Sequence, residues 1–258
     1  MVRTGSGESV LSRAIRIIEV FSPTEPALPV TEIARRTGLH VATTSRLITE
    51  LVEHGLLERR PDRTVRIGVR MWELGWRASP RLGLRDAAMP FLEDLHAVVG
   101  QHAQLGVLDG GDVLFIERLS ARDAVVNYSR IAGRLSLPHS SSGLVLLAHA
   151  PVEVQEDVLT RPLRPPTAAA FRTAQQLRVA LADVRRQQSA VLAGHQHPDA
   201  TGVAVPVRDA RGDVVAALSV IVPNDGRAQS LVPALLAAAR GITRAISDPA
   251  AVAVPPPG

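Results

Sequence analysis

The segment that most constrains this chain covers residues 30–54. Its first part places Ile33 and Ala34 on one side of a predicted helix, and Gly38 follows at a sharp turn. Two short helices joined by a turn that contains Gly are typical of a helix-turn-helix. The second helix of that motif lies in the major groove of DNA, although a helical hairpin inside an ordinary core has the same pattern. The inward positions predicted for the second helix are Leu47, Ile48 and Leu51.

A β-hairpin is predicted directly after the second helix. An extended segment starts at Gly55, the turn Pro61-Asp62-Arg63 follows, and residues 64–67 alternate polar and apolar side chains. A hairpin in this place forms a wing beside the helix-turn-helix. A solvated surface hairpin could also be basic, but only Glu58 and Asp62 stand among four arginines, which favours a wing that faces phosphate. These arginines are Arg59, Arg60, Arg63 and Arg66.

The exposed start of the second helix supplies the predicted contacts with bases. Val41 and Ala42 can meet a thymine methyl group, and Thr43 can reach a base or a phosphate. Arg46 can pair with guanine or phosphate, and its alternative is a solvated charge on a helix surface. The full set of predicted contacts is His40, Val41, Ala42, Thr43, Ser45 and Arg46.

Composition narrows the classes of protein further. The chain has no cysteine, which excludes disulfides, thiolate metal sites and cysteine nucleophiles. All 29 basic residues are arginine, and residues 1–80 hold 12 of them against 9 acidic residues, so they carry +3 of the net charge of +4. No apolar run approaches the ~20 residues of a membrane span, and the N-terminus lacks the apolar core of a secretory signal. We therefore expect a cytoplasmic protein without contact to a membrane.

A second domain is predicted to start at residue 84. Its hairpins alternate with amphipathic helices, which indicates an antiparallel-rich α/β sheet and an α+β fold class overall. The predicted helices cover 84–99, 143–150, 175–188 and 231–246, the predicted strands cover 102–108, 113–119, 124–129, 203–208 and 214–222, and a loop is predicted over 134–142.

The only two tryptophans lie on a predicted connecting helix over residues 71–80, which Ser79-Pro80 ends. Because tryptophan buries a large area, Trp72 and Trp76 are expected to pack between domains or between subunits.

Three serines and a glycine, Ser140-Ser141-Ser142-Gly143, precede an apolar predicted helix. Hydroxyl and free N–H groups at a helix N-terminus can bind a carboxylate, and the alternative is simple capping by Ser142. Ser219 in the last predicted strand is a second candidate for the lining of a binding site, against the alternative of a surface serine.

The sequence His195-Gln196-His197 with Asp199 has the composition of a metal site. Glycine and proline flank it, which favours a solvated loop instead. His102 and His139 could join such a site only if the fold brought them close. We therefore predict no metal and no cofactor.

Five segments in order along residues 9–247 resemble the IclR family of bacterial transcriptional regulators. They are TEIARRTGLHVATTSRLITELVEHGLLER, RTVRIGVRMWELG, GVLDGGDVLFIERL, RLSLPHSSSGLVLLA and GVAVPVRDARGDVVAALSVIVP. The resemblance implies a winged helix-turn-helix that binds double-stranded operator DNA and a GAF-like α/β domain that binds a small organic-acid effector. It also implies homodimers, in some members paired into tetramers.

The resulting domain organisation runs along the whole chain. It comprises a disordered N-terminus over 1–8, a winged helix-turn-helix domain over 9–70, a linker helix over 71–83, a GAF-like effector-binding domain over 84–248 and a mobile tail over 249–258.

The chain departs from the family pattern near the predicted effector site. Leu144 stands where the family usually has lysine, and Gly202 lies about where some members have a cysteine. In the preceding loop, Ser136, Pro138 and Ser140 replace the usual Pro, His and Thr. Loss of the lysine leads us to expect an aromatic or medium-sized organic acid. The predicted effector-binding residues are Ser140, Ser141, Ser142, Gly143, Leu144, Val205, Leu218 and Ser219.

Two other classes of protein compete with this interpretation. A hydrolase could use the Ser140–Ser142 region, but the G-x-S-x-G elbow is absent, as are P-loop and dinucleotide motifs. A sensor that acts only through protein partners would not need the wing arginines. We therefore expect a regulator that is not an enzyme and controls a catabolic operon.

Overall fold

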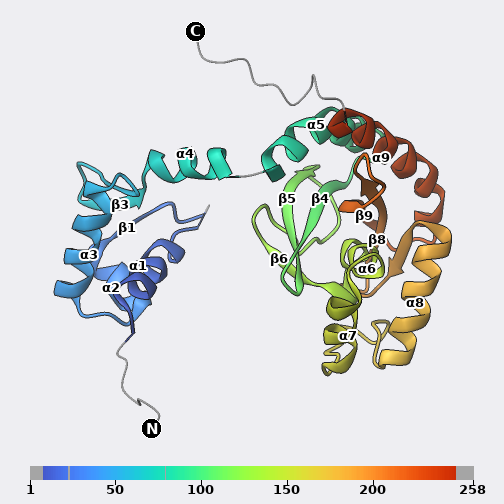
Figure 1. Ribbon diagram of the computed structural model, residues 1–258, viewed down its shortest axis with the longest axis horizontal. Helices are drawn as coiled ribbons and strands as arrows, with labels where there is room; N and C mark the ends of the chain where they lie inside the picture. Colours follow the sequence, from blue (N-terminus) through green and yellow to red (C-terminus); the bar gives the residue numbers. More distant parts are fainter. Residues whose placement is uncertain (1–7, 23, 79, 248–258) are drawn as a thin grey trace. The chain divides into compact units, whose positions relative to one another are not determined.

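The computed structural model describes residues 8–22, 24–78 and 80–247 and divides the chain into two compact units, 1–79 and 80–258 (Figure 1). The mobile tail predicted over 249–258 lies outside the described residues. Residues 1–7 of the predicted disordered N-terminus and Ser79 of the predicted helix end also lie outside them.

The first unit is a winged helix-turn-helix, as predicted. Its three-stranded antiparallel sheet has the order β1-β3-β2, in which β2 and β3 form the wing hairpin and β1 pairs with β3. Strand β1 was not predicted, because three residues that end in proline carry almost no pattern. The elements are α1 (Val10–Glu19), β1 (Ala27–Pro29), α2 (Val30–Thr37), α3 (Val41–Glu53), β2 (Leu57–Arg59), β3 (Thr64–Ile67) and α4 (Val69–Ala78).

The turn between α2 and α3 follows from local chemistry. Gly38 ends α2 with a φ of 66°, the left-handed conformation that favours glycine, and the His40 side chain caps α3 by accepting a hydrogen bond from the Ala42 N–H at 3.3 Å. The predicted inward residues Leu47, Ile48 and Leu51 are buried and pack in one core with α1, α2 and the wing.

The second unit contains a six-stranded sheet of order β6-β5-β4-β9-β8-β7, in which every pair of neighbours is antiparallel. The predicted α+β fold class is confirmed. The elements are α5 (Pro80–Val99), β4 (His102–Asp109), β5 (Asp112–Ser120), β6 (Arg134–Ser136), the 3₁₀ turn η1 (Leu137–His139), α6 (Ser141–Ala148), α7 (Val152–Thr160), α8 (Ala174–Gln187), β7 (Ala190–Ala193), β8 (Ala200–Arg208), β9 (Val214–Pro223), η2 (Ala228–Leu231) and α9 (Val232–Ser247).

Helices cover both faces of this sheet, so its strands alternate between two cores (Figure 1). Val205 and Leu218 belong to the core that contains Leu92 of α5 and Leu235 of α9. Residues one position away, such as Ala204, face the core formed with α6, α7 and α8. The alternation of side chains between the two faces decides which of them can reach a ligand.

The prediction of a third strand over 124–129 was wrong. The segment is extended but makes no ladder. Side chains at the start of β4 instead satisfy part of its backbone: the Val125 N–H donates to Oε1 of Gln101, the residue before β4, at 2.8 Å, and His102 Nε2 donates to the Val125 carbonyl at 2.6 Å. The strand that pairs with β5 is instead β6, which lies within the loop predicted over 134–142. Helix α7 and strand β7 were also not predicted.

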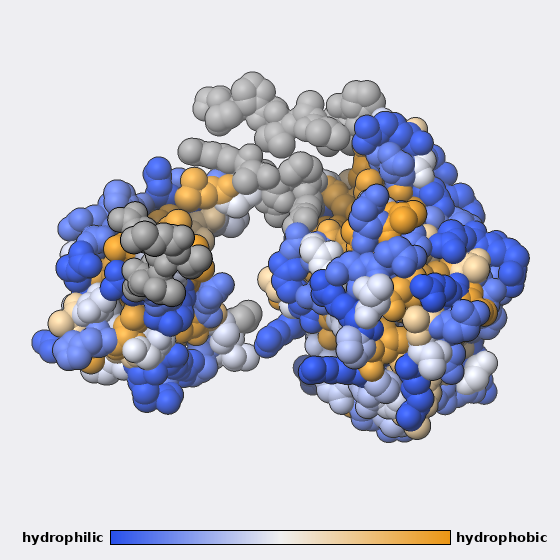
Figure 2. Space-filling model, turned by 60° about the horizontal axis from the view of Figure 1, so that its bottom comes forward, coloured by the Kyte–Doolittle hydropathy of each residue, from blue (hydrophilic) through white to orange (hydrophobic). Residues whose placement is uncertain are grey.

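The surface of each unit mixes hydrophilic and hydrophobic residues, with the hydrophilic ones in the majority on the face that Figure 2 shows. Among the described residues, no helix is both long and apolar enough to cross a bilayer. Trp72 is 66% exposed, and its burial between domains or subunits stays a prediction. The side chain of Trp76 lies outside the described residues.

Candidate functional site

The recognition helix α3 presents its N-terminal turn to solvent. His40, Val41 and Ala42 are exposed, whereas Thr43 and Ser45 are half-buried. Arg46 is also exposed, but its guanidinium donates to Glu50 Oε1 at 2.9 Å one helical turn later. This exposed pair is weakly held, so Arg46 can leave Glu50 for a base or a phosphate.

The tip of the wing is a hydrogen-bonded turn. The carboxylate of Asp62 accepts hydrogen bonds from the N–H and the hydroxyl of Thr64, at 3.0 and 2.6 Å, and these bonds lower the pKa of Asp62. The next residue, Arg63, has a φ of 64°, and its N–H donates to the Arg60 carbonyl at 3.0 Å. The turn therefore holds the Arg60 and Arg63 backbones in one defined geometry.

The four wing arginines differ in what they contact. Arg66 forms a bidentate pair with Glu58, the residue opposite it on the hairpin, and Arg59 donates to the hydroxyl of Thr49 on α3 at 3.4 Å. Within the described ranges, Arg60 and Arg63 make no ion pair or side-chain hydrogen bond. Their charges are the ones most available to phosphate.

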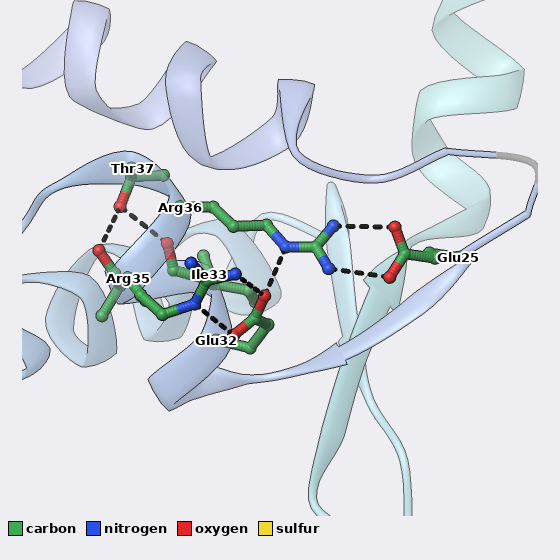
Figure 3. Close-up of polar contacts among 7 residues, drawn as sticks. Glu25, Glu32, Ile33, Arg35, Arg36 and Thr37 are labelled. Carbon is green, nitrogen blue, oxygen red and sulfur yellow. Dashed lines mark hydrogen bonds and ion pairs between the residues drawn. The ribbon is translucent and has the colours of Figure 1, made fainter.

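In contrast to Arg60 and Arg63 of the wing, the two arginines of helix α2 are paired with carboxylates (Figure 3). Arg36 donates to both carboxylate oxygens of Glu25 at 2.9 and 2.7 Å and to Glu32 at 2.6 Å, while Arg35 donates to both oxygens of Glu32. Hydrogen bonds from the two arginines lower the pKa of Glu32 to about 2. The positive charge of α2 is therefore largely neutralised within the unit.

The second unit contains a cavity at the start of α6. It is closed on one side by the segment 121–133, which we call the strap. The strap is tied to β4: Asn127 Nδ2 and the Ser129 hydroxyl both donate to Gln104 Oε1. The lining comprises Gln104, Val126, Asn127, Tyr128, Leu135, His139, Ser140, Ser141, Leu192, His195, Gln196, His197, Ala200, Gly202 and Ile221.

Two buried histidines stand in the cavity with unused hydrogen-bonding capacity. His139 is 4% exposed and His195 is 9% exposed. Neither ring nitrogen of His139, nor Nδ1 of His195, has a hydrogen-bond partner among the described residues. Burial lowers the pKa of His139, and burial together with nearby His139 lowers the pKa of His195 to about 4. Both imidazoles are therefore neutral near pH 7.

The three serines at the start of α6 have three separate roles. Ser140 caps the helix, because its hydroxyl oxygen accepts from the Gly143 N–H at 3.1 Å, a role the sequence had offered to Ser142. The Ser141 side chain reaches the cavity and packs on Gly202, where an added Cβ would lie 2.6 Å from Ser141 Oγ. Ser142 donates to Ser219 Oγ at 2.7 Å, in a pair that is buried below the cavity lining.

Several predicted effector-binding residues lie elsewhere. Val205 and Leu218 are paired on β8 and β9, but they face the core with α5 and α9 on the opposite side of the sheet. Leu144 is 2% exposed in the core with α8. Gly143, Ser142 and Ser219 lie near the cavity without lining it, and Ser219 is fully buried rather than on the surface. Only Ser140 and Ser141 of the predicted set reach the cavity.

The side chains of the H-x-H-x-D segment do not converge on one point. No group of three or more histidine, aspartate or glutamate side chains in the described part of the chain could hold a metal ion. His195 points into the cavity with its ring edge-on to Phe171 at 4.7 Å, while Asp199 is exposed and lies 3.9 Å from His197. The prediction that no metal binds stays a prediction.

Sequence reasoning missed most of the polar cavity lining. Gln104, Asn127 and Tyr128 carry no motif, and His139 and His195 come together only because η1 and the β7–β8 connection meet at one end of the sheet. One available signal was Gln104, a polar side chain that stands between the apolar residues Ala103 and Leu105 inside a predicted strand.

Comparisons with known proteins agree with this architecture. Residues 77–248 match the family described as bacterial transcriptional regulator IclR C-terminal, and residues 10–61 match the IclR helix-turn-helix domain. The HTH-type transcriptional regulator XynR of Escherichia coli is 30% identical over 212 residues, which cover 81% of this chain and 84% of that protein.

Solved structures are also similar. An IclR homolog from Microbacterium hydrocarbonoxydans, complexed with 4-hydroxybenzoate, is 42% identical with a TM-score of 0.86, over 92% of this chain and 98% of that one. An IclR homolog from Microbacterium sp. strain HM58-2 is 40% identical with a TM-score of 0.61, over 92% and 97% of the two chains. This chain belongs to the IclR family of bacterial transcriptional regulators.

Proposed function

We propose that this regulator responds to an aromatic carboxylic acid of the 4-hydroxybenzoate class, bound in the cavity between the strap and the start of α6. The observation that carries the proposal is the lining: the neutral imidazoles of His139 and His195, three side-chain amides and two serine hydroxyls stand among apolar side chains and the ring of Tyr128. A site of this kind orients a ring through few polar contacts. The structure neighbour that is 42% identical was solved with 4-hydroxybenzoate, which supports this ligand class.

The polar groups suit the two ends of such an acid. His139 and His195 offer ring nitrogens that can donate to a carboxylate or accept from a phenol. Ser141 adds a hydroxyl beside the first turn of α6, where the helix dipole favours negative charge. The apolar side chains of Leu135, Leu192 and Ile221 would contact the ring.

We further propose that homodimers, alone or paired into tetramers, read a pseudo-palindromic operator through two copies of α3. Such a protein works beside the chromosome, which places it in the cytoplasm. Its target would be an operon for catabolism of the acid that it binds.

Thermal-shift measurements on the full chain with 4-hydroxybenzoate test the proposal. We expect the acid to raise the melting temperature, and Ser141→Ala to reduce that increase. Ser142→Ala is the matched control: it breaks the buried bond to Ser219, so it lowers stability but should leave the ligand-induced shift nearly intact. No shift with 4-hydroxybenzoate or related benzoates, or an equal response in both variants, would show that the ligand class or the site is wrong.

A further inference from the structure

The cavity lacks a fixed positive charge. None of the described side chains that line it is an arginine, and the chain contains no lysine. A carboxylate that enters loses its hydration, and burial of an unpaired charge is costly. The partial charge at the start of α6 offsets this cost only in part, because that helix has eight residues and Ser140 already occupies the Gly143 N–H. A buried acid therefore needs another source of counter-charge.

Histidine is the residue in the lining that can supply it. Three ring nitrogens, both of His139 and Nδ1 of His195, are buried without partners among the described residues. Polar atoms in this state are costly to leave unsatisfied, and they are rare in native interiors. Two imidazoles that face one cavity with open nitrogens can accept one proton between them and then donate to a carboxylate.

We propose that the cavity binds its acid together with one proton from solvent, which the His139–His195 pair holds as the counter-charge of the carboxylate. This inference rests on the proposed function and adds a mechanism by which the cavity would select an acid. The pair makes the cavity specific for an acid over a neutral isostere, because only an anion raises the proton affinity of the imidazoles.

The charged groups around the pair are consistent with neutral imidazoles in the empty cavity. On its outer side, His139 also lines a groove with Arg134, Arg161, Arg164 and Asp112. Arg134 is paired with Asp109 and Arg161 with Asp157, so much of this charge is compensated.

The other face of the cavity carries His197 and Tyr128, whose rings lie 6.1 Å apart. Nδ1 of His197 already accepts from the Asp199 N–H at 3.3 Å, and the exposed Asp199 carboxylate lies nearby. His197 is therefore partly occupied, whereas the nitrogens of His139 and His195 are open.

The sign of the linkage follows from these states. Burial holds the pKa of both histidines low in the empty cavity, and a bound carboxylate raises the pKa of at least one of them. Between the low and the raised value, binding takes up a proton. Affinity then falls as pH rises, by up to about tenfold per pH unit.

Isothermal titration calorimetry of the full chain tests the proposal, with 4-hydroxybenzoate near neutral pH in two buffers of different ionisation enthalpy. The difference between the two heats measures proton exchange, and we expect uptake of about one proton per site. The neutral isostere 4-hydroxybenzamide should bind more weakly and take up none.

Variants identify where the proton resides. His139→Gln and His195→Gln keep a hydrogen-bonding side chain that does not titrate, and uptake should fall in one or both and disappear in the double variant. His149→Gln is the matched control, because burial also lowers the pKa of His149 but it lies outside the cavity.

Each outcome separates the two proposals. Binding of 4-hydroxybenzoate without proton uptake by the wild-type chain overturns the proton-linked mechanism and leaves the ligand class standing. Undiminished uptake in the double variant also overturns it, since the ligand itself would then carry the proton. Absence of any binding refutes the proposed function instead. If the variants fail to fold, an affinity of the wild-type chain that does not change with pH is sufficient to reject the mechanism.

Discussion

The wing and the cavity solve opposite electrostatic problems. In the wing, the exposed Arg60 and Arg63 side chains form no ion pair among the described residues, whereas the positive charge of α2 is neutralised by Glu25 and Glu32. In the cavity, His139 and His195 are buried and uncharged. An exposed guanidinium stays charged without a phosphate at little cost in free energy, because water solvates it. A buried imidazole that lacks a partner is expected to become charged only when its ligand binds.

The same contrast applies to packing. The exposed arginines of the wing can be replaced without steric consequence, so their contributions should be graded and dependent on salt. The cavity wall and the start of α6 behind it are packed to atomic contact, since an added Cβ would meet a neighbour at 2.6 Å at Gly202 in the wall and at 2.3 Å at Gly143 behind it. Substitutions there should act through sterics and be insensitive to salt.

The largest effect is expected for Gly143→Ala. The new Cβ would lie 2.3 Å from the Leu137 carbonyl oxygen, a backbone atom that cannot rotate away. Overpacking of this kind costs about 1–3 kcal/mol, and we expect the upper end. Urea denaturation followed by circular dichroism measures the loss.

Gly83→Ala is the control for this change, because Gly83 is also helical and has no atom within 4 Å of its added Cβ. It should raise stability slightly. Equal stability of the two variants would contradict the claim that the start of α6 is packed to contact.

A smaller effect is expected for the double variant Arg60→Ala with Arg63→Ala. If each side chain neutralises one phosphate, the slope of log affinity against log salt becomes shallower by about 2, which corresponds to roughly tenfold less affinity lost between roughly 50 and 200 mM salt. Fluorescence anisotropy with operator DNA at several salt concentrations measures the slope.

The matched control is Arg35→Ala, which removes a guanidinium that both oxygens of Glu32 already bind. Its salt slope should equal that of the wild-type chain. A slope unchanged in the wing variant but reduced in the control would reverse our division between available and neutralised arginines.

The smallest effect is expected for Glu32→Gln, in the dependence of stability on acidic pH. The Glu32 pKa of about 2 lies below the ordinary value of 4.5, so its pairing with Arg35 and Arg36 contributes stability above pH 4.5 that is lost as pH falls toward 2. In Glu32→Gln, the melting temperature of the first unit should fall less steeply over that interval than in the wild-type chain.

Glu53→Gln serves for comparison, because Glu53 makes no ion pair within the described ranges and should leave the acid profile unchanged. Identical profiles for all three proteins would mean that the network of Figure 3 does not contribute measurably in solution.

Local patterns were sufficient to predict the first unit. The spacing of Leu47, Ile48 and Leu51, the left-handed Gly38 and the turn at Asp62 act within a few residues of one another, so the sequence by itself determined the helix-turn-helix and the wing hairpin. It also determined the family, because five segments match in order.

Only the tertiary structure decided the cavity. Val205 was predicted to line the site, whereas Gly202 was noted only as a departure from the family pattern. Successive residues of a strand face opposite sides of the sheet, so two positions three apart cannot both face the cavity. In β8, which pairs with β9, Gly202 faces the cavity and Val205 faces the core on the other side. His139 and His195 both line the cavity because two connections that are distant in sequence, η1 and the β7–β8 connection, meet at one end of the sheet. Their chemistry depends on burial and on missing partners, which are properties of the packed chain rather than of any local pattern.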